Sequence, residues 1–270
     1  MAGPPKAGTT SLYQWLADHP DAHPSLIKEP DYFNDIPNPK AIDHFSRNGW
    51  PGYEKLFGNW NGEKVIFEAS PKYIYSDLAL SKLNEIDKLK VVFLYREEPD
   101  RLYSEYRFHR YKTQLFSGNF DAYLKQKGYD ISKAKLPAKR FEDYVSDWIA
   151  AFGSENVSII DFKSLISDPE KAMKNLCNFL GLDPSFYSGY SFDRLNKTQG
   201  VKNRKLHYWL LDFYDYIPKP LIALLKSFYY RINGSEIPKK SVEEAELLSI
   251  LTESIDKLSS KEARENWNWL

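Results

Sequence analysis

Gly3-Pro4-Pro5-Lys6-Ala7-Gly8-Thr9-Thr10 stands near the start of the chain and runs directly into Ser11-Leu12-Tyr13-Gln14-Trp15-Leu16. Gly8 lets backbone N–H groups approach an anion closely, and the dipole of a helix that begins here favours negative charge. Thr9 and Thr10 add hydroxyl donors, and Lys6 adds a cation. The stretch therefore predicts a phosphate-binding loop at a helix start, although a solvated turn that caps a helix would have a similar composition.

The loop differs from the phosphate loop of ATPases and GTPases in the position of its lysine. In that motif the lysine follows the last glycine directly, whereas here Thr9 follows Gly8 and Lys6 lies before it. This displacement argues against an ordinary ATPase or GTPase. Only Met1 and Ala2 precede the loop, where a buried strand normally stands, so we expect a strand that is very short or clipped at the N-terminus.

The composition limits the partners of the chain. Lysine and arginine together number 37, as do aspartate and glutamate, so the 270 residues carry no net charge. A neutral chain is not drawn as a whole to nucleic acid, and any anion site must be local. The single cysteine, Cys177, excludes an intrachain disulfide and fits a reducing compartment. With no apolar run long enough to span a bilayer and no signal peptide, the sequence predicts a cytoplasmic protein.

Hydrophobic runs alternate with amphipathic segments along most of the chain. Short apolar runs at 65–67, 90–95 and 157–160 predict buried strands. Periodic segments predict helices at 9–17, 76–89, 99–111, 141–152, 169–180 and 242–258. Strands that alternate with helices indicate an α/β fold, a three-layer parallel sheet flanked by helices of the P-loop-like type. We expect a single domain over residues 1–270.

Three stretches are less regular. Residues 112–137 are polar and predict irregular structure, and 183–205 predict a loop. An aromatic helix is expected from about residue 206, with a break at Pro218 and Pro220 and a second apolar segment up to Ile232. Ordinary core packing is the simplest interpretation of residues 207–232. The same pattern would suit peripheral contact with a membrane, a cover for a hydrophobic acceptor or a dimer contact.

A second anion-binding motif begins where the strand at 90–95 ends. Ligands bind at the carboxyl ends of strands in open α/β sheets, and Arg96 stands at that end. A P-loop NTPase would usually place an aspartate near here to organise Mg²⁺, whereas an arginine binds phosphate directly. Ser104, on the following helix, is placed to hold the same phosphate. An arginine merely paired with Glu97 or Glu98 on a solvated face is the alternative.

A third motif lies in the loop before the aromatic helix. Four cations and a glycine occur within Asn196–Lys205, and we expect Lys197, Gly200, Lys202 and Arg204 to contact an anion. Taken alone, a charge run of this kind is more often simply solvated.

Together the three motifs resemble those of sulfotransferases that use 3′-phosphoadenosine 5′-phosphosulfate (PAPS). Lys6–Thr10 resembles the 5′-phosphosulfate loop of that family, Arg96–Ser104 its 3′-phosphate motif, and Lys197–Arg204 its later PAPS-contacting loop. The similarity is closest to the branch of heparan sulfate N- and 3-O-sulfotransferases and their bacterial relatives. The resemblance implies an enzyme that transfers a sulfuryl group from PAPS to a hydroxyl or amine of a carbohydrate-like acceptor.

Other segments resemble the same branch. Lys28–Phe33 resembles the segment that carries the catalytic glutamate, and Trp50 and Tyr53 stand where the family has an aromatic stretch on the acceptor side. Glu68–Tyr73 resembles a Glu-Lys-Thr-Pro segment, and Asn268–Leu270 resembles a Trp-Leu tail. One departure is Ala69, where relatives often carry a lysine that Lys72 could replace. Another is the lack of cysteines beside the later loop, which fits a cytosolic protein of bacterial type.

The resemblance also implies roles for single residues. Lys6 and the backbone of Ala7, Gly8, Thr9 and Thr10 would hold the 5′-phosphate, and Lys6 would stabilise the charge that grows on it. Glu29 would be the general base. His109 is the strongest rival base, and Glu68 ranks second among the carboxylates. No cluster of histidine and cysteine has metal-ligand spacing, so we expect no metal.

Two other function classes stay open at this point. A Mg²⁺-dependent P-loop kinase or nucleotide-binding protein would share the first loop, and a PAPS-binding interaction protein without activity would share all three motifs.

Overall fold

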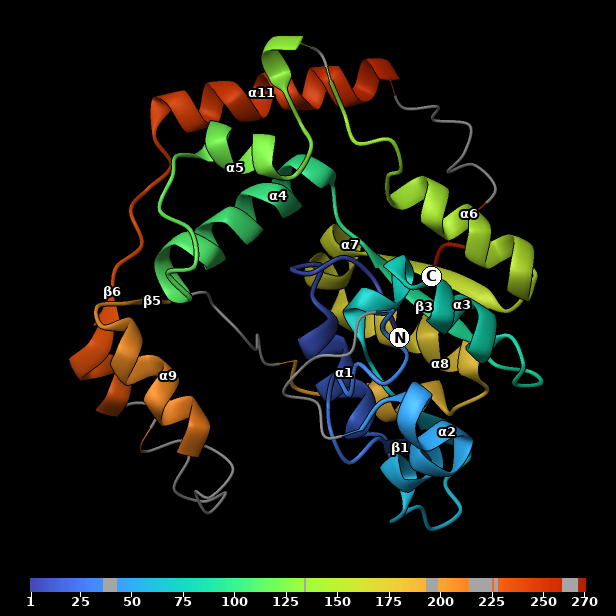
Figure 1. The fold of residues 1–270 in the computed structure, drawn as a ribbon. Coiled ribbons are helices and arrows are strands. Elements are labelled where there is room, and N and C mark those ends of the chain that lie inside the picture. The colour runs from blue at the N-terminus through green and yellow to red at the C-terminus, as the bar shows by residue number, and fades with distance from the viewer. Residues whose placement is uncertain (36–42, 134, 193–198, 214–224, 226–227, 259–266) are drawn as a thin grey trace. The chain divides into compact units, whose positions relative to one another are not determined.

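The computed structural model describes residues 1–35, 43–133, 135–192, 199–213, 225, 228–258 and 267–270. The chain forms two compact units (Figure 1). The first, here called the sheet unit, comprises Met1–Glu97, Ala138–Asn196 and Ser260–Leu270. The second, the helical unit, comprises Glu98–Pro137 and Lys197–Ser259.

Parallel strand pairs form the centre of the sheet unit. β3 (Val91–Tyr95) pairs in parallel with β4 (Val157–Asp161), with Val91 opposite Val157. β1 (Ala22–Pro24) pairs in parallel with β2 (Val65–Phe67). Every residue of β3 is buried, which is expected of a strand that is covered on both faces.

The first residues of the chain join these two pairs. On one side the N–H of Ala2 donates to the carbonyl of Val92 at 2.9 Å, and its carbonyl accepts from the N–H of Leu94 at 3.1 Å. On the other side the N–H of Ser70, just beyond β2, donates to the carbonyl of Met1 at 3.1 Å. Ala2 thus forms an isolated parallel bridge with Phe93, and the loop leaves the sheet beside the end of β3.

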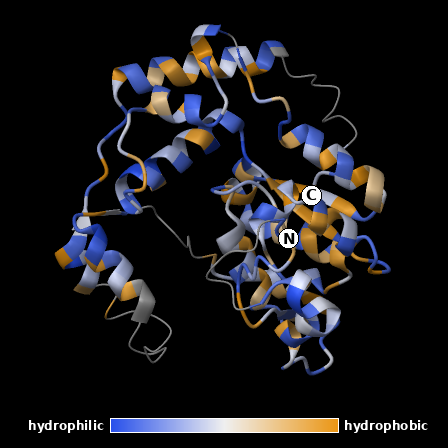
Figure 2. Cartoon of the chain, in the orientation of Figure 1, coloured by the Kyte–Doolittle hydropathy of each residue, from blue (hydrophilic) through white to orange (hydrophobic). Residues whose placement is uncertain are grey.

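Two layers of helices cover the two faces of this sheet. Alternate residues of β3 point in opposite directions, so Phe93 packs on the cluster that contains Trp148, whereas Leu94 packs on the cluster that contains Leu12 and Met173. The first face carries α3 (Asp77–Leu83) and α6 (Phe141–Phe152), and the second carries α1 (Thr9–Ala17), α7 (Phe162–Ser167) and α8 (Pro169–Leu180). The predicted three-layer arrangement is confirmed. Figure 2 shows strong hydrophobic colouring on the central strands.

Shorter elements complete the sheet unit: α2 (Phe45–Glu54), η1 (Lys55–Phe57), η2 (Pro71–Tyr75) and η5 (Pro184–Tyr187). The tail adds to β4, because the N–H of Ile159 donates to the carbonyl of Asn268 at 2.9 Å and the N–H of Leu270 donates to the carbonyl of Ile159 at 2.9 Å. None of the helices in the described parts of the chain is long and apolar enough to cross a bilayer.

The helical unit has a core of its own, built mainly from aromatic and leucine side chains. Its elements are α4 (Glu98–Arg107), η3 (Phe108–Lys112, a π-helical turn), α5 (Phe120–Gln126), η4 (Ile131–Lys133), β5 (Gly200–Val201), α9 (Arg204–Phe213), β6 (Gly234–Ser235) and α11 (Val242–Leu258). Leu102 and Tyr106 of α4 pack with Phe120 and Leu124 of α5 and with Leu251 of α11. β5 and β6 pair in antiparallel fashion.

The structure departs from the sequence-based elements in a few places. Residues 120–126 form a helix inside a stretch predicted to be irregular, because Asn119 caps the N–H of Ala122 at 3.0 Å and the apolar residues that follow are buried. The helix expected at 76–89 ends at Leu83 and is followed by turns. The aromatic helix begins at Arg204, and the expected break at Pro218 and Pro220 lies outside the described residues.

Candidate functional site

The loop before α1 adopts a backbone that favours glycine. Gly3 and Gly8 have φ angles of +142° and +99°, and Lys6 has a φ of +72°. A Cβ atom at Gly3 would lie 2.8 Å from the carbonyl oxygen of Leu94, and one at Gly8 would lie 2.9 Å from Cδ2 of Phe162. Side chains are therefore excluded at both glycines. Gly8 is also the N-cap of α1, and no side chain caps this helix, so its first N–H groups can serve an anion.

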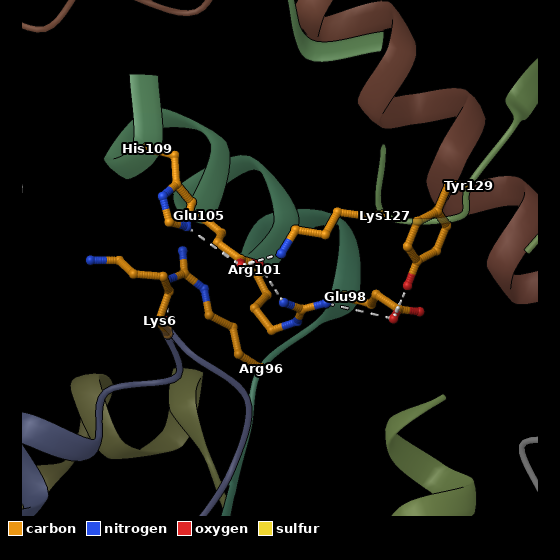
Figure 3. A network of polar contacts seen from close by, with 8 residues as sticks. All are labelled: Lys6, Arg96, Glu98, Arg101, Glu105, His109, Lys127 and Tyr129. Carbon is orange, nitrogen blue, oxygen red and sulfur yellow. Dashed lines mark hydrogen bonds and ion pairs between the residues drawn. The ribbon is translucent and has the colours of Figure 1, made fainter. Parts of the chain in front are cut away.

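Arg96 reaches back to this loop from the end of β3. Its Nη1 donates a hydrogen bond of 2.8 Å to the carbonyl oxygen of Lys6. The guanidinium carbon lies 4.5 Å from the centre of the Phe162 ring. Figure 3 shows the Arg96 side chain beside the loop that carries Lys6. The structure thus brings two predicted phosphate-binding residues together, and it concentrates positive charge at one edge of a chain that is neutral overall.

The segment of Glu29 lies beside the segment that begins at Glu68. The N–H of Glu29 donates to the carbonyl of Ala69 at 3.1 Å, and the residue has a φ of +58°. Its carboxylate pairs with the ammonium group of Lys28, and its side chain is 44% exposed. A general base must be reachable by a substrate, and this exposure meets that condition.

Backbone bonds continue from this segment to the phosphate loop. The N–H of Asp31 donates to Oγ of Ser70 at 3.2 Å, and the N–H of Gly3 donates to the carbonyl of Pro71 at 3.2 Å. Lys72, considered as a replacement for the lysine missing at Ala69, pairs with Asp31 at 3.3 Å. Glu29, the Glu68–Tyr73 segment and the loop therefore follow one another across neighbouring stretches of backbone.

Glu68 is buried in this region, where its carboxylate bonds to the side chain of Ser70. Burial raises the pKa of its carboxyl group above the ordinary value, and this effect exceeds the opposing ones, which include the hydrogen bond of Ser70. Oγ of Ser70 donates to Oε2 of Glu68 at 2.7 Å. Burial, followed by the charge of Glu68, raises the pKa values of Tyr53 and Tyr73 well above the usual range. The two phenols are therefore neutral at physiological pH. Glu68 orients the Ser70 hydroxyl, which accepts the N–H of Asp31 close to Glu29.

The second group of predicted residues belongs to the helical unit. Ser104 lies on α4 and is partly exposed, and the next residue, Glu105, is buried. The carboxylate of Glu105 lies 2.9 Å from Nη1 of Arg101, 2.7 Å from Nζ of Lys127 and 3.8 Å from Nε2 of His109 (Figure 3). The rival base His109 is thus a neighbour of a carboxylate that pairs with Arg101 and Lys127.

This network sets the charge state of Glu105. Burial by itself would raise the pKa of the carboxyl group, but hydrogen bonds from His109 and Lys127 and the charge of Arg101 outweigh it and lower the pKa to about 2. Nη2 of Arg101 also lies 3.8 Å from Glu98, whose carboxylate accepts a hydrogen bond from the Tyr129 hydroxyl. Sequence reasoning missed Glu105, although its i,i+4 spacing from Arg101 and His109 was visible.

The later loop is anchored within the helical unit. Gly200 lies in β5, the N–H of Lys202 donates to the carbonyl of Asn233 at 2.8 Å, and Nη1 of Arg204 donates to the carbonyl of Gln114 at 3.3 Å. Nε2 of Gln114 in turn donates to the carbonyl of Val201 at 2.6 Å. Gln114, which no motif indicated, therefore holds this loop. Lys197 lies outside the described residues.

The stretch considered for membrane or partner contact is only partly described. His207 bonds through Nδ1 to the hydroxyl of Tyr229 at 2.7 Å, which ties α9 to the helical turn at 228–233. Trp209, Phe228 and Ile232 are exposed. Among the described residues, no group of three or more histidine, cysteine, aspartate or glutamate side chains could hold a metal ion.

A model of the family described as "Sulfotransferase domain" matches residues 1–209. The chain belongs to this family. The bifunctional heparan sulfate N-deacetylase/N-sulfotransferase 4 of Mus musculus is 26% identical over 200 residues, which are 69% of this chain and 22% of that protein. The human enzyme named N-deacetylase/N-sulfotransferase 1 is 26% identical over 196 residues, 67% of this chain and 22% of that protein. The chain thus spans about a fifth of the length of these curated relatives.

Solved structures support the fold. A sulfotransferase from Alicyclobacillus acidocaldarius superposes with a TM-score of 0.57 at 22% identity, covering 84% of this chain and 94% of that one. Mouse sulfotransferase SULT7A1, solved as a complex with PAP, gives a TM-score of 0.51 at 15% identity, covering 98% of this chain and 85% of that one. The predicted family and the predicted sulfotransferase fold are confirmed, whereas the roles of single site residues stay predictions.

Proposed function

We propose that this sulfotransferase moves a sulfuryl group from PAPS to a hydroxyl or amine of a carbohydrate-like acceptor. The observation that supports the donor most strongly is the hydrogen bond from Arg96 to the carbonyl of Lys6, which joins two cationic motifs at the start of α1. The donor is further supported by the PAP complex of the mouse structure. The carbohydrate acceptor is supported by the names of the heparan sulfate relatives.

Donor binding would use the anion-binding features described above. The side chain of Lys6 and the N–H groups of residues 8–10 would hold the 5′-phosphate, since Gly8 leaves the helix start open. Arg96 and Ser104 would hold the 3′-phosphate, and the loop of Gly200, Lys202 and Arg204, with Lys197, would contact the nucleotide. Bidentate donation by an arginine needs no metal ion.

The transfer forms a bond between the acceptor oxygen or nitrogen and sulfur, and it breaks the bond from sulfur to the bridging oxygen of the 5′-phosphate. Negative charge builds on that phosphate as the bond breaks, so Lys6 would stabilise the transition state more than the bound donor. The acceptor must also lose a proton. Glu29 would accept it, because its carboxylate is partly exposed and its backbone is bonded to Ala69 within the sheet unit.

Titration calorimetry with PAP, the desulfonated donor product, tests this proposal directly. We expect tight binding of PAP without Mg²⁺ and much weaker binding of ATP. The kinase alternative predicts the opposite result, with ATP preferred and Mg²⁺ required. Transfer of labelled sulfate from PAPS to a panel of glycan, alcohol and amine acceptors then separates an enzyme from a PAPS-binding protein without activity.

Residues 207–232 need a separate experiment. Co-sedimentation with anionic and neutral liposomes tests peripheral membrane contact, which is suggested by the exposed side chains of Trp209, Phe228 and Ile232. Sedimentation with anionic liposomes but not with neutral ones would support peripheral membrane contact. A cytoplasmic location and a bacterial origin stay predictions.

A further inference from the structure

We propose that Phe162 is a positioning residue for the donor: its ring holds the phosphate loop at Gly8 and the guanidinium of Arg96 in one fixed arrangement. The inference rests on the proposed function and deepens it. Phe162 is the first residue of α7 and directly follows β4, so neither anion-binding motif includes it. Its backbone position is set by the parallel pairing of β4 with β3, since Tyr95 and Asp161 are register partners.

The first contact of the ring is with the phosphate loop. A Cβ atom at Gly8 would lie 2.9 Å from Cδ2 and 3.0 Å from Cε2 of Phe162, which places the ring directly against the Gly8 backbone. At this point the backbone has a φ of +99° and begins α1. The ring therefore backs the residue whose neighbouring N–H groups would face the phosphate.

The second contact is with Arg96. Its guanidinium carbon lies 4.5 Å from the ring centre, and its Nη1 donates to the carbonyl of Lys6 at 2.8 Å. The face of an aromatic ring attracts a guanidinium and holds it in place, while its N–H groups remain able to donate to a carbonyl or a phosphate. The hydrogen bond to Lys6 is a second restraint on the same guanidinium. Phe162 thus links the end of β3 to the loop through two contacts of a single ring.

Because the ring already holds Arg96 and the loop in place in the free protein, less conformational entropy is lost when the donor binds. Without the ring, Arg96 and the loop would have to be ordered by the nucleotide itself. We therefore expect Phe162 to affect donor affinity and the KM for PAPS. The KM for the acceptor should not change, because the Glu29 segment is held by bonds that do not involve Phe162.

Three substitutions separate stacking from general packing. Phe162→Ala should weaken PAP binding roughly tenfold and raise the KM for PAPS by a similar factor, the range expected for one lost cation–π contact. Phe162→Tyr should bind PAP as the unaltered protein does, and Phe162→Leu, which keeps bulk without an aromatic face, should be weakened. Unchanged PAP affinity in Phe162→Ala or Phe162→Leu overturns the proposal, and so does a loss that Phe162→Tyr does not rescue.

Phe179→Ala provides a matched control. Phe179, like Phe162, is a half-buried phenylalanine of the sheet unit. A cation lies over its ring as well, because Nζ of Lys90 is 4.9 Å from the ring centre. Lys90 precedes β3, whereas Arg96 follows it, so this contact belongs to the opposite end of the strand. Phe179→Ala should leave PAP affinity unchanged. Equal losses in the two alanine variants would indicate a general loss of stability and would overturn the proposal.

A measurement without nucleotide distinguishes this inference from the proposed function. The ring current of Phe162 should shift the Nε–H proton resonance of Arg96 upfield in the free protein, and Phe162→Ala should abolish that shift. If the unaltered protein binds no PAP, the proposed function fails, whatever the resonance shows. If it binds PAP and the Arg96 resonance does not move in Phe162→Ala, the positioning role alone is overturned.

Discussion

Lys6 holds a backbone conformation that lysine rarely adopts, with a φ of +72°. A left-handed conformation costs a residue with a Cβ about 1–2 kcal/mol relative to glycine. Lys6→Gly should therefore keep or slightly raise the thermal stability while it removes the cation from the loop. We expect kcat to fall at least about 100-fold, the loss typical of one electrostatic donor at a reacting phosphate.

Thermal melting and initial-rate kinetics of Lys6→Gly and Lys6→Ala check this expectation. The alanine variant loses the same charge but keeps the strained backbone, so the two should be equally inactive and should differ in stability. Activity retained in both variants would remove Lys6 from the reaction.

Glu29 and His109 are rival bases that mutation can separate. Glu29→Gln should lower turnover by about 10²–10⁴-fold, because the amide cannot accept the acceptor's proton. PAP binding should remain within a few fold, since Glu29 belongs to no donor-binding motif. Lys28→Met is the control for the loss of the Lys28–Glu29 ion pair. Near-normal turnover in Glu29→Gln, together with a large loss in His109→Ala, would assign the role to His109.

At the level of single elements, α4 depends on the charge of Glu105. Its pKa is lowered to about 2 from the ordinary 4.5, so the folded state favours the ionised form. This stabilisation is fully present above about pH 4.5 and is lost as the pH falls through 2. At 1.36 kcal/mol per pKa unit it is on the order of 3 kcal/mol.

Hydrogen exchange of the α4 amides between pH 2 and 6 measures this contribution. Glu105→Gln should flatten the pH dependence and lower the opening free energy at neutral pH, because Arg101 and Lys127 lose their shared carboxylate. Asp121→Asn, which removes the carboxylate of the exposed pair with Lys125, should cost under about 1 kcal/mol. A pH dependence that Glu105→Gln leaves intact would contradict the assignment.

The capping residue Asn119 should determine the stability of α5. Asn119→Ala removes the bond to the N–H of Ala122, and we expect a loss of about 1 kcal/mol. Asn119→Asp keeps a capping oxygen and should retain most of the stability. Hydrogen exchange within residues 120–126 reports the change, and an alanine variant with unaltered protection would refute the role of the cap.

Several helices were predictable because their ends carry local signals. Gly153 and Gly181 follow α6 and α8, and Pro169 begins α8, so the predicted ranges 141–152 and 169–180 match the structure. The helix α5 was missed although Phe120, Tyr123 and Leu124 have helical spacing, because the polar residues around it obscured a short pattern.

The residues of the candidate site also divide into those that a local pattern of sequence indicates and those that it does not. The loop at Gly8 and the arginine after β3 were visible because each depends on a short run of sequence. Phe162 and Gln114 were not visible, because each acts through contacts between segments far apart in the chain. No local pattern specifies which side chain packs behind a glycine.

At the scale of the whole molecule, donor binding should raise the free energy of unfolding. At a PAP concentration 100 times its dissociation constant, binding stabilises the folded state by about 2.7 kcal/mol. For a chain of this length we expect the Tm to rise by several degrees, at roughly 2–4 °C per kcal/mol. Differential scanning fluorimetry with PAP, and with ATP and Mg²⁺ as the comparison, measures the shift. A larger shift with ATP would favour the kinase alternative.

The bond between Arg96 and the carbonyl of Lys6 has a consequence for how mutants of this protein are interpreted. Under the proposed mode of donor binding, a change at Arg96 would alter the contact with the 3′-phosphate and, through the bond to Lys6, the contact with the 5′-phosphate. Both contacts are then weakened in one variant, and the kinetics of that variant alone do not show how much of the loss belongs to each phosphate. Donor analogues that lack one phosphate or the other, assayed against the same substitution, would apportion the loss between the two ends of the nucleotide.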